Sequence, residues 1–138
     1  MSDRPEIWFY SPYSQQEAAS ANFSLHFADD QSDEEIYRQD VALPAQASIV
    51  NVTLPAAAPA LLPGRTYCWY LEVPCSQNAE EISPATLTGE IQRVQPSATL
   101  QDCPNADSTP LECGIAYAAA GIWYDTFQSL VQLRNSAD

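Results

Sequence analysis

The chain of 138 residues contains no lysine, and its cationic side chains are five arginines set against eighteen aspartates and glutamates. The formal charge of −13 argues against nucleic acid as a partner, because affinity for nucleic acid depends on Lys and Arg neutralising phosphates. Anionic membrane surfaces are disfavoured for the same reason. Solubility is the plainest reason for so acidic a chain, and attraction of a basic partner is the alternative.

Glycine and histidine are also scarce, with four glycines and a single histidine, His26. The few glycines form no P-loop or dinucleotide-type motif. One histidine argues against histidine-rich zinc sites and against a Ser-His-Asp triad. We expect His26 to be an ordinary side chain on the exposed face of a strand, and we expect no cofactor.

The sequence has no apolar run near the ~20 residues of a transmembrane helix, so we expect no membrane span. The start, Met-Ser-Asp-Arg-Pro, is too polar for a signal peptide. The chain is therefore either cytosolic or a mature form whose signal has been removed. Four cysteines favour an oxidising compartment. We expect a periplasmic or extracellular location.

Residues 61–73 carry the clearest structural signal. Leu61, Pro63 and Tyr67 have the spacing of a tyrosine corner, in which a Pro-Gly turn crosses between two sheets and the tyrosine hydroxyl bonds to upstream backbone. From Tyr67 to Val73 the residues then alternate, which is typical of a strand with one buried face. The pattern predicts a mainly β protein, a fibronectin/immunoglobulin-like β-sandwich.

Five other runs of residues are also predicted to be strands. With the corner strand, the predicted strands lie at residues 7–10, 23–27, 36–43, 49–54, 67–73 and 85–94. Prolines lie between these runs, where the hydrogen-bond ladder can spare an N–H. We therefore expect residues 7–95 to form the sandwich.

After Pro96 the pattern becomes helical. A short helix is predicted at residues 111–120, ended by Gly121, and Trp123 and Phe127 begin the apolar face of a second helix. The pair resembles one unit of a tetratricopeptide array, which cannot bury its own face. We expect one domain, residues 1–138, in which a Cys-containing loop (96–110) leads to a helical hairpin (111–134) docked on the sandwich, with Trp123 and Phe127 buried there.

The cysteines predict disulfides rather than zinc. Steps of seven and ten residues lack the close cysteine pairs of a Cys₄ site. Cys68 and Cys75 would lie about 23 Å apart on one extended strand unless the chain reverses between them. Cys103–Cys113 is the preferred pairing, because prolines shape a compact loop between them, and Cys75–Cys103 is the alternative.

Five segments carry a resemblance to a known family. They are residues 7–13 (Ile-Trp-Phe-Tyr-Ser-Pro-Tyr), 35–38, 67–70, 89–94 and 121–125. Together they span nearly the whole chain and resemble a cyanobacterial family catalogued as a domain of unknown function, family nine-twenty-eight. The resemblance implies an exported protein with no assigned activity, so it identifies no catalytic residues in this chain. Members usually have a further strand-like stretch before the aromatic run at 7–10, which this chain lacks.

The candidate partner surface consists of Trp8, Phe9, Tyr10 and Tyr13. In a fibronectin-like topology the run at 7–10 best matches the second strand, so the sandwich is expected to begin with an unpaired edge. Such an edge invites pairing with another chain, as in donor-strand complementation. We expect a non-enzymatic interaction or structural module of the cell envelope or extracellular space, with a protein partner or as a homo-oligomer. Truncation or a loop covering the edge is the alternative.

A carboxylate-dependent hydrolase or binder of envelope polysaccharide is the rival function. Glu72, Glu90 and Asp125 are candidate carboxylates, but the sequence singles out no pair. The acidic turn at residues 29–35 lacks the glycine and regular alternation of an EF-hand loop, so we expect a solvated hairpin tip. We therefore assign no catalytic residue and no metal ligand.

Overall fold

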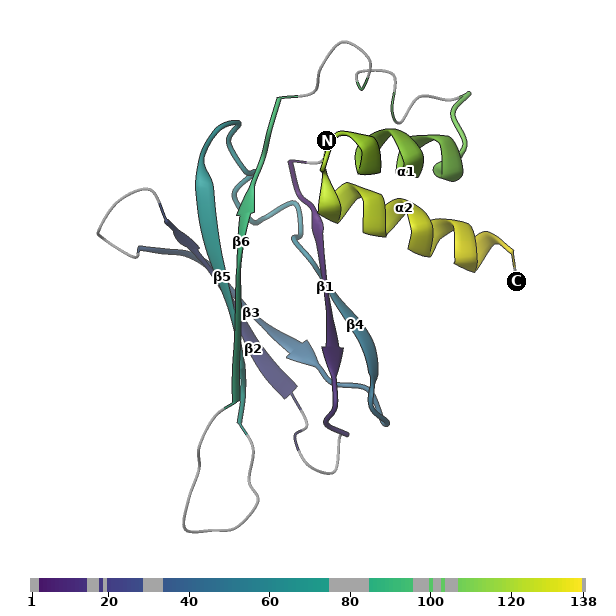
Figure 1. Ribbon diagram of the computed structural model, residues 1–138. Helices are drawn as coiled ribbons and strands as arrows, with labels where there is room; N and C mark the ends of the chain where they lie inside the picture. The colour runs from purple at the N-terminus through teal and green to yellow at the C-terminus, as the bar shows by residue number, and fades with distance from the viewer. Residues whose placement is uncertain are drawn as a thin grey trace.

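The computed structural model describes residues 3–14, 18, 20–28, 34–74, 85–95, 100, 103 and 107–137. Within these ranges the protein consists of two β-sheets followed by a pair of helices (Figure 1). The elements are β1 (Glu6–Ser11), β2 (Ser20–Phe27), β3 (Glu35–Ala42), β4 (Ser48–Thr53), β5 (Thr66–Val73), β6 (Ala85–Gln92), α1 (Pro110–Ala119) and α2 (Trp123–Ser136). The predicted mainly β fold with a C-terminal helical pair is confirmed.

The sheets differ in width. The smaller contains β1 and β4, and the larger has the order β3-β2-β5-β6, with every neighbouring pair antiparallel. Among the described residues, β1 pairs with β4 alone and β6 with β5 alone. Each sheet therefore has an edge strand, β1 or β6, and these two edges lie on the same side of the molecule (Figure 1).

The main core lies between the two sheets. Ile7 and Val52 of the smaller sheet meet Phe23, Leu25 and Leu71 of the larger, and none of these side chains is more than 1% exposed. Full burial of one such side chain is worth roughly 1.5–3 kcal/mol. Alternate residues point into this core, which is why the period of the sequence located the strands.

The tyrosine corner joins the two sheets. Tyr67 is buried, and its hydroxyl accepts a hydrogen bond from the backbone N–H of Leu62 at 2.9 Å. Gly64 has φ +79°, a conformation that glycine adopts at little cost, and its N–H donates to the carbonyl of Arg93 at 2.8 Å. The Arg93 guanidinium returns a bond of 3.0 Å to the carbonyl of Leu61. The turn is thus tied both to β5 and to the end of β6.

The helices form a hairpin with a small core of its own. α1 begins in a capping box in which Thr109 and Glu112 bond reciprocally, and Gly121, with φ +72°, makes the turn to α2. A Cβ on Gly114 would lie 3.4 Å from that of Ser129, so a small residue there lets the helices approach closely. Leu100, Cys113 and Tyr117 are the buried members of this second core.

The prediction that Trp123 is buried against the sandwich is wrong. Trp123 is 68% exposed, whereas Phe127 is half-buried and its ring lies 5.7 Å from that of Trp8 in β1. The rings of Trp123 and Phe127 are 5.9 Å apart, so both lie on one helix face, as predicted. Within the described ranges the smaller sheet consists of two strands, and α2 meets it through β1. Trp123 therefore lies over Phe127 without a strand beneath it.

Candidate functional site

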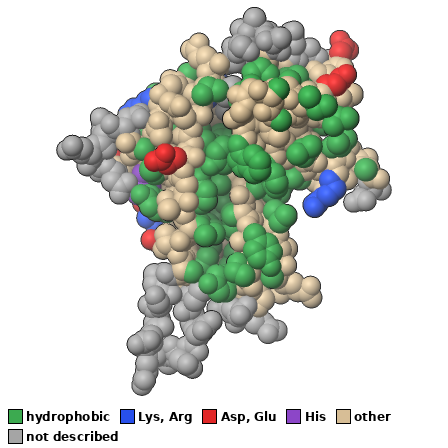
Figure 2. All heavy atoms as spheres, in the orientation of Figure 1, with side chains coloured by type: hydrophobic (Ala, Val, Ile, Leu, Met, Phe, Trp, Pro, Cys, Tyr) green, Lys and Arg blue, Asp and Glu red, His purple; other side chains and the backbone are tan. Residues whose placement is uncertain are grey.

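The described part of the chain covers the side of the molecule between β1 and β6 incompletely. Leu87 of β6 pairs with Leu71 of β5 and shares its inward face, yet Leu87 is 42% exposed and Leu71 is fully buried. Each strand covers about 4.8 Å of a facing sheet, so two strands cannot cover four. A cleft results, and Figure 2 shows hydrophobic side chains gathered along the middle of this face.

The lower part of the cleft is a hollow of about 300 Å³ between the edge strands. It is lined by Phe9, Tyr10, Ser11, Pro12, Tyr13, Leu71, Val73, Ala85 and Leu87. None of these residues carries a charge. Such a lining favours an apolar side chain, because burying a charge here would leave it without a partner.

The middle hollow, of about 210 Å³, lies on the outer face of β1, where α2 rests on that strand. Its lining is almost wholly aromatic: Trp8, Phe9, Tyr10, Ile49, Trp123, Tyr124 and Phe127. Tyr10 is 60% exposed. The indole Nε1 of Trp8 is buried and has no hydrogen-bond partner within the described part of the chain. Phe9 and Tyr10 line both this hollow and the lower one.

The upper part, of about 190 Å³, lies between the end of β6 and the turn joining α1 to α2. Tyr124 lines it together with Glu90 and Asp125, and also lines the middle hollow. The Tyr124 hydroxyl accepts a bond from Trp69 Nε1 at 3.1 Å and donates to the carbonyl of Glu90 at 3.0 Å. One side chain of α2 thus joins the hairpin to both β5 and β6 of the larger sheet.

The predicted partner surface does not form one flat patch. Trp8 and Tyr10 point outward from β1 and line the middle hollow, whereas Phe9 points into the core and is 9% exposed. Tyr13, beyond the strand, is half-buried in the lower hollow. The alternation of a strand separates neighbours onto opposite faces, so these four residues meet only around the cleft.

His26 lies on the outer face of its sheet, as expected, but it is more enclosed than the sequence indicated. Its side chain is only 13% exposed on the outer face of the larger sheet, with its ring 5.0 Å from that of Tyr70. Its Nε2 lies 3.1 Å from Ser24 Oγ and 3.9 Å from Glu35 Oε2. A catalytic triad uses the two ring nitrogens for the two partners, whereas here one nitrogen meets both. The arrangement is therefore not a triad.

No group of three or more His, Cys, Asp or Glu that could hold a metal ion occurs among the described residues. Residues 29–33 of the acidic turn lie outside those residues. Glu35, at the start of β3, pairs with Arg38, whose hydrogen bonds lower the pKa of the Glu35 carboxyl.

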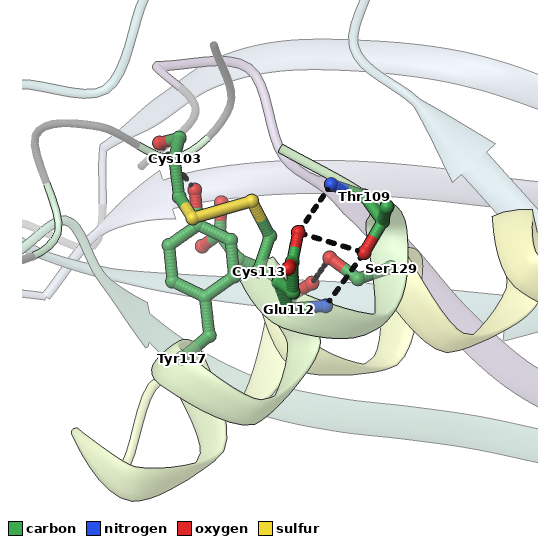
Figure 3. The surroundings of a disulfide bond; sticks show 7 residues. Cys103, Thr109, Glu112, Cys113, Tyr117 and Ser129 are labelled. Carbon is green, nitrogen blue, oxygen red and sulfur yellow. Dashed lines mark hydrogen bonds between the residues drawn. A yellow bond between two sulfur atoms is a disulfide. The ribbon is translucent and has the colours of Figure 1, made fainter. Parts of the chain in front are cut away.

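The predicted disulfide Cys103–Cys113 is present, which excludes the alternative through Cys103; Cys75 itself lies outside the described residues. Figure 3 shows the bond beside Tyr117, whose hydroxyl donates to the carbonyl of Cys103 at 2.7 Å. Burial raises the pKa of that hydroxyl, and Asp125 raises it further. The disulfide thus fastens the loop before α1 to the helical hairpin.

Several cleft residues were not predicted. Leu87 lies in the predicted strand at residues 85–94, but nothing in the sequence indicates that its inward face would be left open. Tyr124 lies in the matched segment 121–125, yet its partners are 55 residues and 34 residues away in the chain. Ile49, 52% exposed beside β1, is on the outer face of β4. No short-range pattern could have brought these side chains together.

The model of one protein family, described as Domain of Unknown Function (DUF928), matches residues 1–138, the whole chain. The chain belongs to this family. No curated protein and no solved structure matches it significantly. Neither helix is long and apolar enough to cross a membrane, a statement that covers the described residues.

Proposed function

We propose that this protein is a non-enzymatic interaction module that accepts an extended segment of another polypeptide along β1, in the cleft facing β6. The observation that carries the proposal is the 42% exposure of Leu87 on the inward face of an edge strand. An inward leucine is normally covered by the opposing sheet. Leu87 is exposed in the same hollow as Phe9 and Tyr13, which indicates that there is space for one more strand.

The strand order supports this proposal. We assign the domain to the fibronectin-like sandwiches. In these folds the second strand has two neighbours in its sheet, and the first strand is one of them. If β1 is that second strand, the position of the first strand is next to β1, facing β6, and no strand of the described residues occupies it. The corner between β4 and β5 fits the same assignment.

Strand addition suits the chemistry of this edge. Main-chain hydrogen bonds to the unpaired side of β1 would supply affinity, and alternate side chains of the added strand would fill the hollows. The lower hollow of about 300 Å³ has room for bulky aliphatic groups. Filling it would cover Leu87, a gain of about 25 cal/mol for each Å² of apolar surface removed from water.

We place the module outside the cytoplasm, in the periplasm or the extracellular space. The Cys103–Cys113 disulfide supports this location, because such bonds persist in oxidising compartments. The cyanobacterial origin and export implied by the resemblance agree with it.

A carboxylate-dependent hydrolase or binder of envelope polysaccharide is the second candidate. It is favoured by Glu90 and Asp125, which line the same hollow, and by the exposed rings of Tyr10 and Trp123, which suit stacking on sugars. Glu72, on the outer face of β5, does not line that hollow. Release of reducing sugar from a bacterial wall polysaccharide, lost in Asp125→Asn, would favour this candidate over the module.

The test uses a short peptide in which valine and threonine alternate, with amide hydrogen exchange as the readout. Binding should slow the exchange of β1 amides, because strand addition gives them new acceptors. Leu87→Asp should weaken binding at least tenfold by placing a charge in the lower hollow.

Ile115→Asp is the matched control, since Ile115 is 61% exposed on α1 and lines none of the three hollows. It should bind like the parent. Protection of β6 or of the helices without β1, or equal effects of both variants, would contradict strand addition along β1.

A further inference from the structure

We infer that the middle hollow, on the outer face of β1, binds a small organic cation that carries a quaternary ammonium group. The inference concerns a second ligand and does not depend on the proposed strand addition. Three observations carry it: the aromatic lining of the hollow, the inclination of its rings, and the charge of the chain.

The lining of the middle hollow is almost entirely aromatic. Six of the seven residues that line it have aromatic rings, and the seventh is Ile49. Among the large hydrophobic side chains that are exposed in the described part of the chain, the aromatic ones are Tyr10 and Trp123. Both line this hollow. Exposed apolar side chains that gather in one place, as these do, indicate a binding surface.

The rings form walls of different orientation rather than one flat platform. The Trp8 ring meets that of Phe127 at 61° with centroids 5.7 Å apart, and the Trp123 ring is tilted by 31° to Phe127 at 5.9 Å. A sugar ring stacks on a flat surface and brings hydroxyl groups that need hydrogen-bond partners when they are buried. The Tyr124 hydroxyl is already engaged within the chain. The hollow therefore suits a compact, rounded group better than a sugar.

Charge selects a cation as that group. The face of an aromatic ring attracts a cation that lies within about 6 Å of its centroid. Glu6 lies on the same face of β1 as Trp8, and Asp125 in the first turn of α2 opposes the partial positive charge of the helix N-terminus. The chain as a whole carries −13, so it attracts cations and repels anions.

A quaternary ammonium group fits this lining better than a primary one. A primary ammonium group has three N–H donors, and their desolvation is costly without acceptors. None of the seven lining side chains has a carboxylate or an amide oxygen to accept them. A trimethylammonium group has no N–H, so its methyl groups can contact the walls while the ring faces attract its charge. The hollow of about 210 Å³ has space for one such group.

The experiment compares three compounds that share a hydroxyethyl group. They are choline, its neutral isostere dimethylbutanol, in which carbon replaces nitrogen, and ethanolamine, which has a primary ammonium group. Titrations of the whole chain are followed through the indole N–H signals of Trp8 and Trp123 in NMR spectra. Choline should bind about tenfold more tightly than either of the others, a difference of 1.4 kcal/mol. Dimethylbutanol isolates the effect of the charge, and ethanolamine isolates that of the methyl groups.

Variants test whether the rings are responsible. Tyr10→Leu and Trp123→Leu keep an apolar side chain at an exposed position and remove the ring, so each should weaken choline binding about fivefold. Binding of dimethylbutanol should change little. Leu62→Ala is the matched control, since Leu62 is 52% exposed and lines none of the three hollows. It should bind choline like the parent.

Three outcomes would overturn the proposal. Failure of choline to shift the indole signals, or equal affinity for choline and dimethylbutanol, would show that the hollow does not recognise the charge. A neutral cello-oligosaccharide that shifts the same signals more strongly would assign the rings to sugar stacking. Association with phosphatidylcholine vesicles would assign the hollow to a lipid headgroup instead of a free solute. None of these results bears on strand addition, which Leu87→Asp tests separately.

Discussion

Trp69 of β5 and Tyr124 of α2 form a hydrogen bond that joins the larger sheet to the helical hairpin. The indole Nε1 donates to the tyrosine hydroxyl at 3.1 Å, and that hydroxyl donates in turn to the carbonyl of Glu90 at 3.0 Å. Tyr124 also packs against the main core. The hairpin is therefore attached to both sheets, through Tyr124 to the larger and through Phe127 and Trp8 to the smaller.

Removal of the Tyr124 hydroxyl should loosen this attachment. Tyr124→Phe leaves the buried indole N–H of Trp69 without its acceptor, and we expect a loss of about 1–3 kcal/mol of unfolding free energy. Urea denaturation followed by tryptophan fluorescence measures it. Tyr10→Phe, at a ring that is 60% exposed, is the control and should change little. Equal stability of the two variants would show that the contact contributes nothing.

Gly89 is required by the ring of Trp69. The two residues face each other across β5 and β6, and a Cβ on Gly89 would lie 2.6 Å from the Cζ2 of Trp69. Gly89→Ala should displace the indole and destabilise the fold by about 1–3 kcal/mol. The near-ultraviolet circular dichroism of the tryptophans should change as well. Thr88→Ala, at an exposed neighbour on the other face, should preserve both.

The tyrosine corner should contribute to stability. Tyr67→Phe removes the acceptor of the Leu62 N–H at a partly buried site, so we expect a cost of about 1–3 kcal/mol in denaturant unfolding. Peptide binding per folded molecule should be unchanged, since the corner lies outside the lower and middle hollows. A variant as stable as the parent would count against the corner as a stabilising element.

Reduction of Cys103–Cys113 should affect the hairpin more than the sheets. The bridge closes a loop with a sequence separation of 10, for which the chain-entropy relation gives about 2–3 kcal/mol. The hairpin core is separate from the main core, so amide protection should fall first in α1 and α2. Hydrogen exchange with and without reductant tests this. Uniform loss of protection in β5 and α1 would mean that the two cores unfold together.

The capping box makes the start of α1 sensitive to acid. Hydrogen bonds from the backbone N–H and the hydroxyl of Thr109 lower the pKa of the Glu112 carboxyl below its ordinary 4.5. A carboxyl whose pKa is lower in the folded state stabilises the fold at pH values above its unfolded-state pKa. This contribution disappears as the pH falls through the folded-state pKa. The difference in unfolding free energy between the parent and Glu112→Gln should therefore shrink as the pH is lowered from neutral to below the pKa of the Glu112 carboxyl. A difference independent of pH would contradict the assignment.

The local features of the fold are determined by the sequence itself. Strand-like runs located the six strands of the described residues, Gly121 marked the end of the first helix, and the spacing of Leu61, Pro63 and Tyr67 indicated the corner. The short loop between Cys103 and Cys113 also indicated their pairing. Each of these signals depends on residues a few positions apart, where chain geometry alone limits the outcome.

Only the tertiary structure decided which faces of the strands and helices are covered by other elements. Alternation places Leu87 on the inward side of β6, but its exposure depends on how many strands the opposing sheet contributes. The same holds for Trp123, which lies beyond the edge of β1, and for His26, which is enclosed by side chains of neighbouring strands. Periodicity specifies the direction of a side chain. Its burial depends on the width and placement of elements that are distant in the chain, and no local pattern encodes that.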